Sequence, residues 1–211
     1  MMVMPGTNSS APVHYWAGRY PNKIGWMFGP NSYRKSKVRE WLPYALDNDA
    51  FGAWQDGREW DEAFYFKFLD WISEQPFQPM WAAVPDVVAD KSRTFENWEK
   101  YAPMVSPYGW DLAFVAQDGM TPSDIPDEAK IVFIGGSRDW KWRNVQGFCE
   151  NFPRVHVGRV NTLYRLWRCH ELGVESVDGT GWFRREECEF MKLQEYFEGI
   201  PHPQMTMDFD E

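Results

Sequence analysis

The sequence predicts a single α/β domain: a compact parallel (β/α)8 barrel with one irregular unit. Short apolar segments alternate with amphipathic stretches along the chain, and polar or glycine motifs follow six of these apolar segments. No G-x-G-x-x-G motif follows the first apolar segment, which counts against a doubly wound dinucleotide-binding sheet. We therefore expect residues 1–211 to form one barrel domain, with flexible tails at 1–12 and 203–211.

Short apolar runs mark the expected strands, and longer amphipathic stretches mark the expected helices. The strands are predicted at 24–28, 44–46, 80–84, 112–116, 131–134, 155–157 and 174–177. The helices are predicted at 60–73, 91–101, 140–151, 162–172 and 184–197. Two of these helices open with residue types that commonly cap a helix N-terminus, Asp90 and the pair Asn161-Thr162.

Length and composition fit one sizeable core. The chain has 211 residues, of which 44% are hydrophobic. No apolar run approaches the roughly 20 residues that cross a bilayer, and the N-terminal stretch resembles no secretion signal, so we expect a cytoplasmic protein. The three cysteines, Cys149, Cys169 and Cys188, fit no disulfide framework, and we interpret them as reduced structural thiols.

The net charge of −9 excludes a broadly basic surface of the kind that binds nucleic acid by electrostatics alone. Positive charge is nevertheless clustered along the sequence. The clusters contain Lys23, Arg34, Lys35, Lys37 and Arg39, then Arg138, Lys141 and Arg143, and finally Arg159, Arg184 and Arg185. Any contact with a polynucleotide is therefore expected to be focal, with some of the 13 tryptophans available for stacking.

The motifs that follow the strands hold the candidate functional residues. In a barrel, the carboxyl ends of the strands converge on one pocket, so these motifs are expected to meet there. The motifs are 46–51, 84–88, 115–119, 134–137, 157–161 and 177–180. Together they predict a site with at least three carboxylates, one amide and a Gly-Gly backbone. Crowded carboxylates raise one another's pKa values, so one can hold a proton while another stays ionised.

Each of these residues also has a purely structural interpretation. Asp47, Asp49, Asp118 and Asp178 are all suited to turns, and Gly135-Gly136 suits a tight turn without a ligand. Arg159 can pair with a barrel carboxylate instead of a phosphate. His156 and His170 lie in no nucleophile or metal spacing and are interpreted as structural.

The order of the motifs resembles the tRNA-guanine transglycosylase superfamily, whose members are (β/α) barrels that exchange guanine for a 7-deazaguanine base. The sequence is more similar to the compact DNA-directed branch found in phages and in bacterial genome-modification clusters. Five motifs carry this resemblance, which spans about residues 24–180: Ala45-Leu46-Asp47-Asn48, Val84-Pro85-Asp86-Val87-Val88, Phe114-Val115-Ala116-Gln117-Asp118-Gly119, Phe133-Ile134-Gly135-Gly136-Ser137 and His156-Val157-Gly158-Arg159-Val160-Asn161.

By position, the resemblance implies that Asp178 is the nucleophile that attacks the anomeric carbon of the sugar and that Asp47 is the general acid/base. It further implies that Asp86, Gln117 and Gly136 read the purine. A carboxylate can accept from the N–H donors of guanine, while an amide and a backbone N–H can donate to its carbonyl. The remaining substrate-binding residues are predicted to be Gly135, Asp49, Phe51 and Arg159.

Two departures from the superfamily pattern are informative. The tRNA enzymes carry a C-x-C-x-x-C plus histidine zinc site after the nucleophile strand, whereas only Cys188 and His202 follow Asp178 here. We therefore expect no zinc, no zinc subdomain and no cofactor. Asp49 stands where the superfamily usually has glycine, and its carboxylate could perturb Asp47 or bind a cationic substituent on the incoming base.

The function expected from the resemblance is exchange of guanine in DNA for a 7-deazaguanine base through a covalent aspartyl intermediate. The partners would be DNA with a flipped or single-stranded guanine and a free 7-deazaguanine, in the host cytoplasm if the protein is phage-encoded, and without a membrane. Three alternatives stay open: a tRNA-directed exchange, a glycoside hydrolase and a non-catalytic nucleic-acid-binding subunit.

Overall fold

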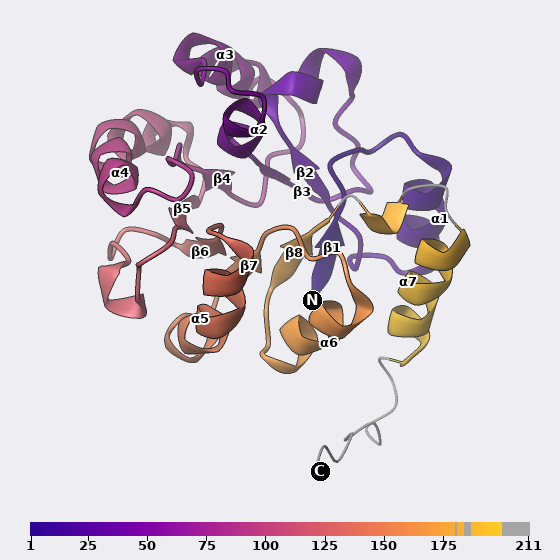
Figure 1. Cartoon of the computed structure of the whole chain (residues 1–211). Helices are drawn as coiled ribbons and strands as arrows, with labels where there is room; N and C mark the ends of the chain where they lie inside the picture. Colours follow the sequence, from indigo (N-terminus) through magenta and orange to yellow (C-terminus); the bar gives the residue numbers. More distant parts are fainter. Residues whose placement is uncertain (180, 184–186, 200–211) are drawn as a thin grey trace.

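The computed structural model describes residues 1–179, 181–183 and 187–199. Within them, eight parallel strands form one sheet in the order β1-β8-β7-β6-β5-β4-β3-β2, with helices around the outside (Figure 1). The strands are β1 (Met2–Met4), β2 (Trp26–Phe28), β3 (Tyr44–Leu46), β4 (Ala82–Ala83), β5 (Leu112–Ala116), β6 (Ile131–Ile134), β7 (Val155–Val157) and β8 (Ser176–Asp178). The predicted α/β barrel is confirmed.

Strand β1 brings the two ends of the sheet together. It pairs with β8 along Met2–Met4, and Val3 forms a parallel bridge with Ile24, just before β2. The Val3 N–H donates to the Lys23 carbonyl at 2.9 Å, and the Val3 carbonyl accepts from Gly25 at 3.0 Å. The prediction of a flexible tail at 1–12 was therefore wrong, because this segment fills the eighth place in the barrel. The predicted tail at 203–211 lies outside the described residues.

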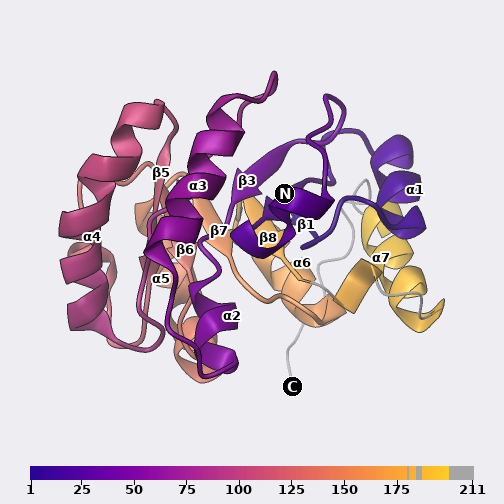
Figure 2. The same ribbon diagram turned by 90° about the horizontal axis from the view of Figure 1, so that it is seen from above.

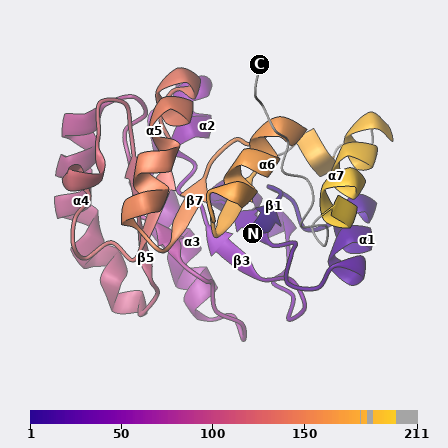
Figure 3. The ribbon, with the colours of Figure 1, turned by 90° about the horizontal axis from the view of Figure 1, so that it is seen from below.

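The helices pack against the outer face of the strands (Figures 2 and 3). They are α1 (Ala11–Arg19), α2 (Ala50–Gln55), α3 (Glu62–Ser73), α4 (Lys91–Val105), α5 (Arg138–Asn151), α6 (Leu163–Glu171) and α7 (Glu187–Gly199). Helix α1, at the start of the chain, lies beside α7, and the rings of Trp16 and Phe197 are 5.6 Å apart. Side chains of Asp61, Asp90 and Thr162 cap α3, α4 and α6.

The barrel is irregular at two of its units. A 3₁₀ helix, η1 (Pro30–Lys35), follows β2, and another, η3 (Pro122–Asp124), lies between β5 and β6, where a regular barrel has an α-helix. Two further 3₁₀ helices are η2 (Ser106–Tyr108) and η4 (Gly181–Phe183). Both irregular units leave the carboxyl ends of their strands in place, so the site face of the barrel keeps its regular layout.

The core has an inner and an outer part. Between the strands and the helices lies a large cluster of aliphatic and aromatic side chains. Inside the barrel lies a smaller cluster, which contains Met4, Met27, Ala45, Trp81, Ala83, Ala113, Val115, Ile131 and Phe133. Because this interior is packed with side chains, the residues that follow each strand cannot turn inward and are presented at the mouth of the barrel.

Candidate active site

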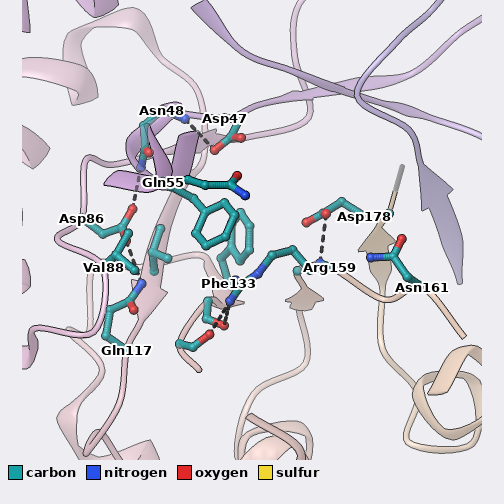
Figure 4. A pocket seen from close by; sticks show the side chains of 16 residues that line it. Asp47, Asn48, Gln55, Asp86, Val88, Gln117, Phe133, Arg159, Asn161 and Asp178 are labelled. Carbon is teal, nitrogen blue, oxygen red and sulfur yellow. Dashed lines mark hydrogen bonds between the residues drawn. The ribbon is translucent and has the colours of Figure 1, made fainter. Parts of the chain in front are cut away.

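A cavity of about 460 Å³ opens at the carboxyl end of the barrel. Its volume lies in the range of small-molecule sites. Eight of the nine site residues predicted from the sequence line it: Asp47, Phe51, Asp86, Gln117, Gly135, Gly136, Arg159 and Asp178. They lie at or after the carboxyl ends of β3 to β8. Figure 4 shows that the side chains of Asp47, Asp86, Gln117, Arg159 and Asp178 surround one space. The structure thus brings together residues that are up to 131 positions apart, from 47 to 178.

Asp178 ends β8 and receives two hydrogen bonds. Its Oδ1 accepts from the backbone N–H of Arg159 at 2.9 Å, and its Oδ2 lies 3.2 Å from Nε2 of His156 (Figure 4 draws the former). Burial on its own would raise the pKa of Asp178, but His156, the Arg159 N–H and the charge of Lys141 outweigh it, and the pKa lies below its ordinary value. Asp178 is therefore ionised at neutral pH.

Asp47 directly follows β3 and has the opposite environment. Burial raises the pKa of Asp47 well above its ordinary value, and the carboxyls of Asp49, Asp178 and Asp86 raise it further. The backbone N–H of Asn48, 2.8 Å from Oδ1, acts in the other direction but does not outweigh them. One cavity thus holds an anionic carboxylate and a carboxyl group that retains its proton at higher pH, the arrangement needed for a nucleophile and an acid.

Asp86 lies in a cluster of amides on the other side of the cavity. Its Oδ1 accepts from the Asn48 side chain at 2.9 Å, and its Oδ2 accepts from Nε2 of Gln117 at 2.7 Å (Figure 4). Burial raises the pKa of Asp86 to about 6, against the hydrogen bonds from the two amides. At pH 7 this group is an oriented hydrogen-bond acceptor, and it becomes a donor in mild acid.

Gln117 is buried, and both ends of its amide are engaged. Its carbonyl accepts from the N–H of Ala89 at 2.9 Å, while its amide nitrogen donates to Asp86. The amide is therefore held in one orientation, and a ligand in the cavity would meet the second N–H rather than the carbonyl. This agrees with the expected role of Gln117 as a donor to a carbonyl oxygen.

The Gly135-Gly136 pair needs glycine at both positions. A Cβ on Gly135 would lie 2.6 Å from the Gln117 amide nitrogen, and one on Gly136 would lie 2.2 Å from Cε3 of Trp140. Gly136 also has a φ of +43°, which glycine adopts without strain. The carbonyls of both glycines accept from Nη2 of Arg159, so this turn is an integral part of the cavity wall.

Arg159 crosses the cavity instead of extending into solvent. Its guanidinium carbon lies 4.2 Å from the centre of the Phe51 ring, a cation–π contact between two residues that line the cavity. Its φ is +58°, and its backbone N–H holds Asp178. Arg159 therefore connects the nucleophile candidate to the flat apolar wall at Phe51.

Asp49 does not line this cavity. It lines a second cavity of about 270 Å³, which shares Asp47 and Asp178 with the first. Its Oδ2 accepts from the N–H of Asn31 at 2.7 Å, and this contact ties the loop after β2 to the start of α2. The role of Asp49 in substrate binding stays a prediction; its backbone is left-handed, with φ +57°, and its carboxyl raises the pKa of Asp47.

Sequence reasoning missed two residues that contact the site. His156 was interpreted as structural, yet its ring bonds Asp178. Lys141 belongs to a basic cluster expected to offer a focal contact to a polynucleotide, but it is buried, and its Nζ donates to the Gly158 carbonyl. Burial, together with the nearby charge of Arg159, lowers the pKa of Lys141 to about 7. A signal was present in the sequence, because Lys141 shares a helix face with Val145 and Phe148.

In the described part of the chain, no three His, Cys, Asp or Glu side chains are grouped so as to hold a metal ion. The absence of zinc stays a prediction. Cys149 and Cys169 are free thiols whose pKa values burial raises to about 11 and 12, while the side chain of Cys188 lies outside the described residues. No helix in the described ranges is long and apolar enough to cross a membrane.

No protein-family model matches the chain, and no curated protein matches it either. Among solved structures, the chain is similar to the crystal structure of a candidate fructose-1,6-biphosphate aldolase from Coccidioides immitis. The TM-score is 0.56 and the sequence identity is 12%, over 92% of this chain and 78% of that chain. At this identity the likeness shows a shared barrel fold and carries no information about the reaction.

Proposed function

We propose that the protein is a DNA-guanine transglycosylase, which exchanges guanine in DNA for a 7-deazaguanine base. The observation that supports this most is the pairing of Asp178 and Asp47 in one cavity, one with a lowered pKa and the other with a raised pKa. Base exchange at a sugar carbon requires an anionic nucleophile and a proton donor on the same face of the barrel. The order of the sequence motifs supplies the second line of support.

The reaction proceeds in two displacements. In the first, an oxygen of Asp178 forms a bond to C1′ of the target nucleotide while the bond from C1′ to guanine breaks, and Asp47 donates a proton to the departing base. In the second, Asp47 takes a proton from the incoming base, whose nitrogen bonds to C1′ and releases Asp178. The enzyme returns to its starting state, and no co-reactant is consumed.

The base is recognised on the side of the cavity that holds Asn48, Asp86 and Gln117. The Asp86 carboxylate, held by Asn48 and Gln117, accepts from the N–H groups on one edge of guanine. The free N–H of Gln117 and the backbone N–H of Gly136 donate to the guanine carbonyl. A 7-deazaguanine presents the same edge, so one site can serve both the departing and the incoming base.

A pair of arginines on α6, stacked on a tryptophan of α5, supports a nucleic acid as the polymer substrate. The guanidinium carbons of Arg165 and Arg168 lie 5.0 and 5.9 Å from the ring centre of Trp142. Among the described residues, neither arginine forms an ion pair, although the chain is acidic overall. Both helices begin directly after loops that line the cavity, and they lie next to each other in the fold (Figure 3). The two guanidinium groups and the tryptophan ring are therefore suited to contact a phosphate backbone and a base of a polymer bound at the cavity.

The direct test of this function is incorporation of a labelled base. The protein is incubated separately with single-stranded DNA, duplex DNA and tRNA in the presence of radiolabelled guanine or a 7-deazaguanine, and label retained in polymer is counted. Label is expected in DNA and not in tRNA. Label in tRNA alone would assign the tRNA-directed exchange, and DNA binding without label would favour the non-catalytic subunit. Release of reducing sugar from oligosaccharides would instead favour the glycoside hydrolase.

The role of the two arginines is tested by removing their charges and, as a control, two charges elsewhere. Arg165→Ala/Arg168→Ala is expected to weaken single-stranded DNA binding and to reduce the salt dependence by about one unit of slope per lost phosphate contact. Lys67→Ala/Lys130→Ala removes the same charge from exposed positions on α3 and before β6, and should leave binding unchanged. Equal losses in both double variants would show that only net charge matters.

A further inference from the structure

His156 is a fully buried imidazole that contacts two polar side chains. Its Nδ1 lies 2.8 Å from Oγ of Ser176, and its Nε2 lies 3.2 Å from Oδ2 of Asp178. The three residues sit on neighbouring strands, since His156 pairs in register with Ser176 across β7 and β8. This chain of contacts is therefore built into the sheet and does not depend on a loop.

Packing fixes the plane of the imidazole. The Trp81 and Phe133 rings approach it edge-on, with centroids at 5.0 and 4.5 Å. His156 and Ser176 have no exposed surface, and Trp81 has none either. A ring enclosed by aromatic groups inside a barrel cannot turn away from its partners without opening the packed interior.

The proton on Nε2 follows from its partner. An ionised Asp178 can only accept, so Nε2 must carry the hydrogen. If the imidazole is neutral, its Nδ1 accepts a hydrogen bond from the Ser176 hydroxyl. If the imidazole is protonated, Nδ1 donates a hydrogen bond to Ser176 instead. In both states the Nε2–H points at Asp178. The Ser176 hydroxyl can donate to Nδ1 or accept from it, so it satisfies Nδ1 in either state.

The solvent exposure of Ser176 and Asp178 shows which end of this row of hydrogen-bonded residues can react. The Ser176 side chain is inaccessible, so it cannot attack a substrate, whereas the side chain of Asp178 is 20% exposed and lines the cavity. The residue types match those of a serine hydrolase triad, but here the carboxylate faces the ligand space and the serine is at the buried end. The imidazole thus serves the carboxylate.

We propose that His156 is a positioning residue, which holds Asp178 in its attacking orientation through the Nε2–H bond while Ser176 binds Nδ1 and anchors the other side of the imidazole. This inference rests on the proposed function, in which Asp178 attacks the sugar. The lowered pKa of Asp178 agrees with it, because the bond from His156 favours the anion. Three other groups also act on Asp178: the Arg159 N–H, the Lys141 ammonium and the Asp47 carboxyl.

The test compares His156→Leu, which removes the N–H at similar volume, with His156→Gln, whose amide can donate from a similar place. His156→Leu is expected to reduce kcat on the order of 10²-fold, with KM for the base unchanged within about twofold. The kcat of His156→Gln should be about tenfold higher than that of His156→Leu. The acid limb of the pH profile of kcat should move to higher pH in His156→Leu, because Asp178 then ionises less readily.

A second readout does not depend on turnover. Titration of ¹³C-labelled aspartate carboxyls by NMR, with Asp178→Asn to assign the signal, gives the pKa of Asp178 in each variant. We expect this pKa to rise by about one unit or more in His156→Leu and by less in His156→Gln and Ser176→Ala. If His156→Leu does not fold, the last two variants carry the comparison.

An unchanged carboxyl titration in the folded variants, or a normal kcat in His156→Leu, would overturn the positioning role. A purely structural role would lower the melting temperature of His156→Leu while leaving both readouts in place. If the wild-type protein exchanges no base, the proposed function fails, and the NMR titration still decides whether His156 controls Asp178.

Discussion

Asp47 and Asp178 are the same residue type at nearly the same place relative to a strand, yet the barrel puts them in opposite states. Asp178 receives a side-chain N–H and a backbone N–H, with the charge of Lys141 nearby. Asp47 receives one backbone N–H and faces three other carboxyls. Burial alone therefore does not decide the charge of a carboxyl group, because the number of hydrogen-bond donors and the sign of the neighbouring charges also contribute.

The largest effect is expected from removing the anionic member of the pair. Asp178→Asn should reduce base exchange on the order of 10⁴-fold or more, because an amide cannot form the glycosyl bond. The fold should persist, since the change removes no core volume. Exchange is measured by label incorporation and folding by circular dichroism, with Asp127→Asn, an exposed aspartate, as control. Near-normal exchange in Asp178→Asn would remove the basis for the comparison.

The protonated member should give a smaller loss and a distinct pH dependence. Asp47→Asn is expected to reduce kcat about 10²- to 10⁴-fold, the usual contribution of a general acid/base. In the wild type, kcat should fall as pH rises through the raised pKa of Asp47, because the proton donor is then lost. This alkaline limb should be absent from the residual activity of Asp47→Asn. Its persistence would assign the limb to another group.

The third carboxyl, Asp86, differs from Asp47 and Asp178 in the proposed reaction because it contributes through hydrogen bonding alone. Its pKa is about 6, so guanine affinity should be constant above that pH and should fall below it, when the group becomes protonated and loses its acceptor role. Asp86→Asn should weaken guanine binding by about 1–3 kcal/mol. Isothermal titration calorimetry at pH 5 and pH 7.5 measures both effects, and equal affinities at the two pH values would place the base elsewhere.

The smallest effect is expected from Lys141, whose buried amine lies near Asp178. Its folded-state pKa of about 7 lies below the ordinary value of 10.5, so between these values the unfolded chain binds a proton that the folded chain does not. Stability should therefore rise with pH above 7, with a slope approaching about 1 kcal/mol per pH unit, and this contribution should be absent from Lys141→Met. Urea unfolding at pH 7 and pH 8.5 tests it; parallel pH dependences in both proteins would contradict a buried neutral amine.

The sequence predicts the regular part of the fold well, for a physical reason. Strands β3, β5, β6 and β7 have the predicted bounds because each is a short apolar run between polar motifs. Strand β1 has only three residues, and its partners in β8 lie more than 170 positions away. Such a strand is stabilised by pairing and burial and leaves no local pattern.

The candidate site shows the same division. Residues at strand ends, such as Asp47 and Asp178, could be placed in one pocket because barrel geometry brings strand ends together. The position of Asp49 could not be predicted, since it depends on one left-handed residue. The contacts of His156 depend on register with β8 and on rings from β4 and β6, which the local sequence does not reveal.

In the proposed reaction, Asp178 forms a covalent bond to the sugar while Asp47 holds the proton. This bond can be detected by mass spectrometry after acid quench of the protein with a guanine-containing single-stranded oligonucleotide. We expect a protein–DNA adduct whose peptide maps to Asp178, which is absent from Asp178→Asn and is discharged by addition of a 7-deazaguanine. An adduct on another residue, or base exchange that proceeds in Asp178→Asn without an adduct, would contradict it.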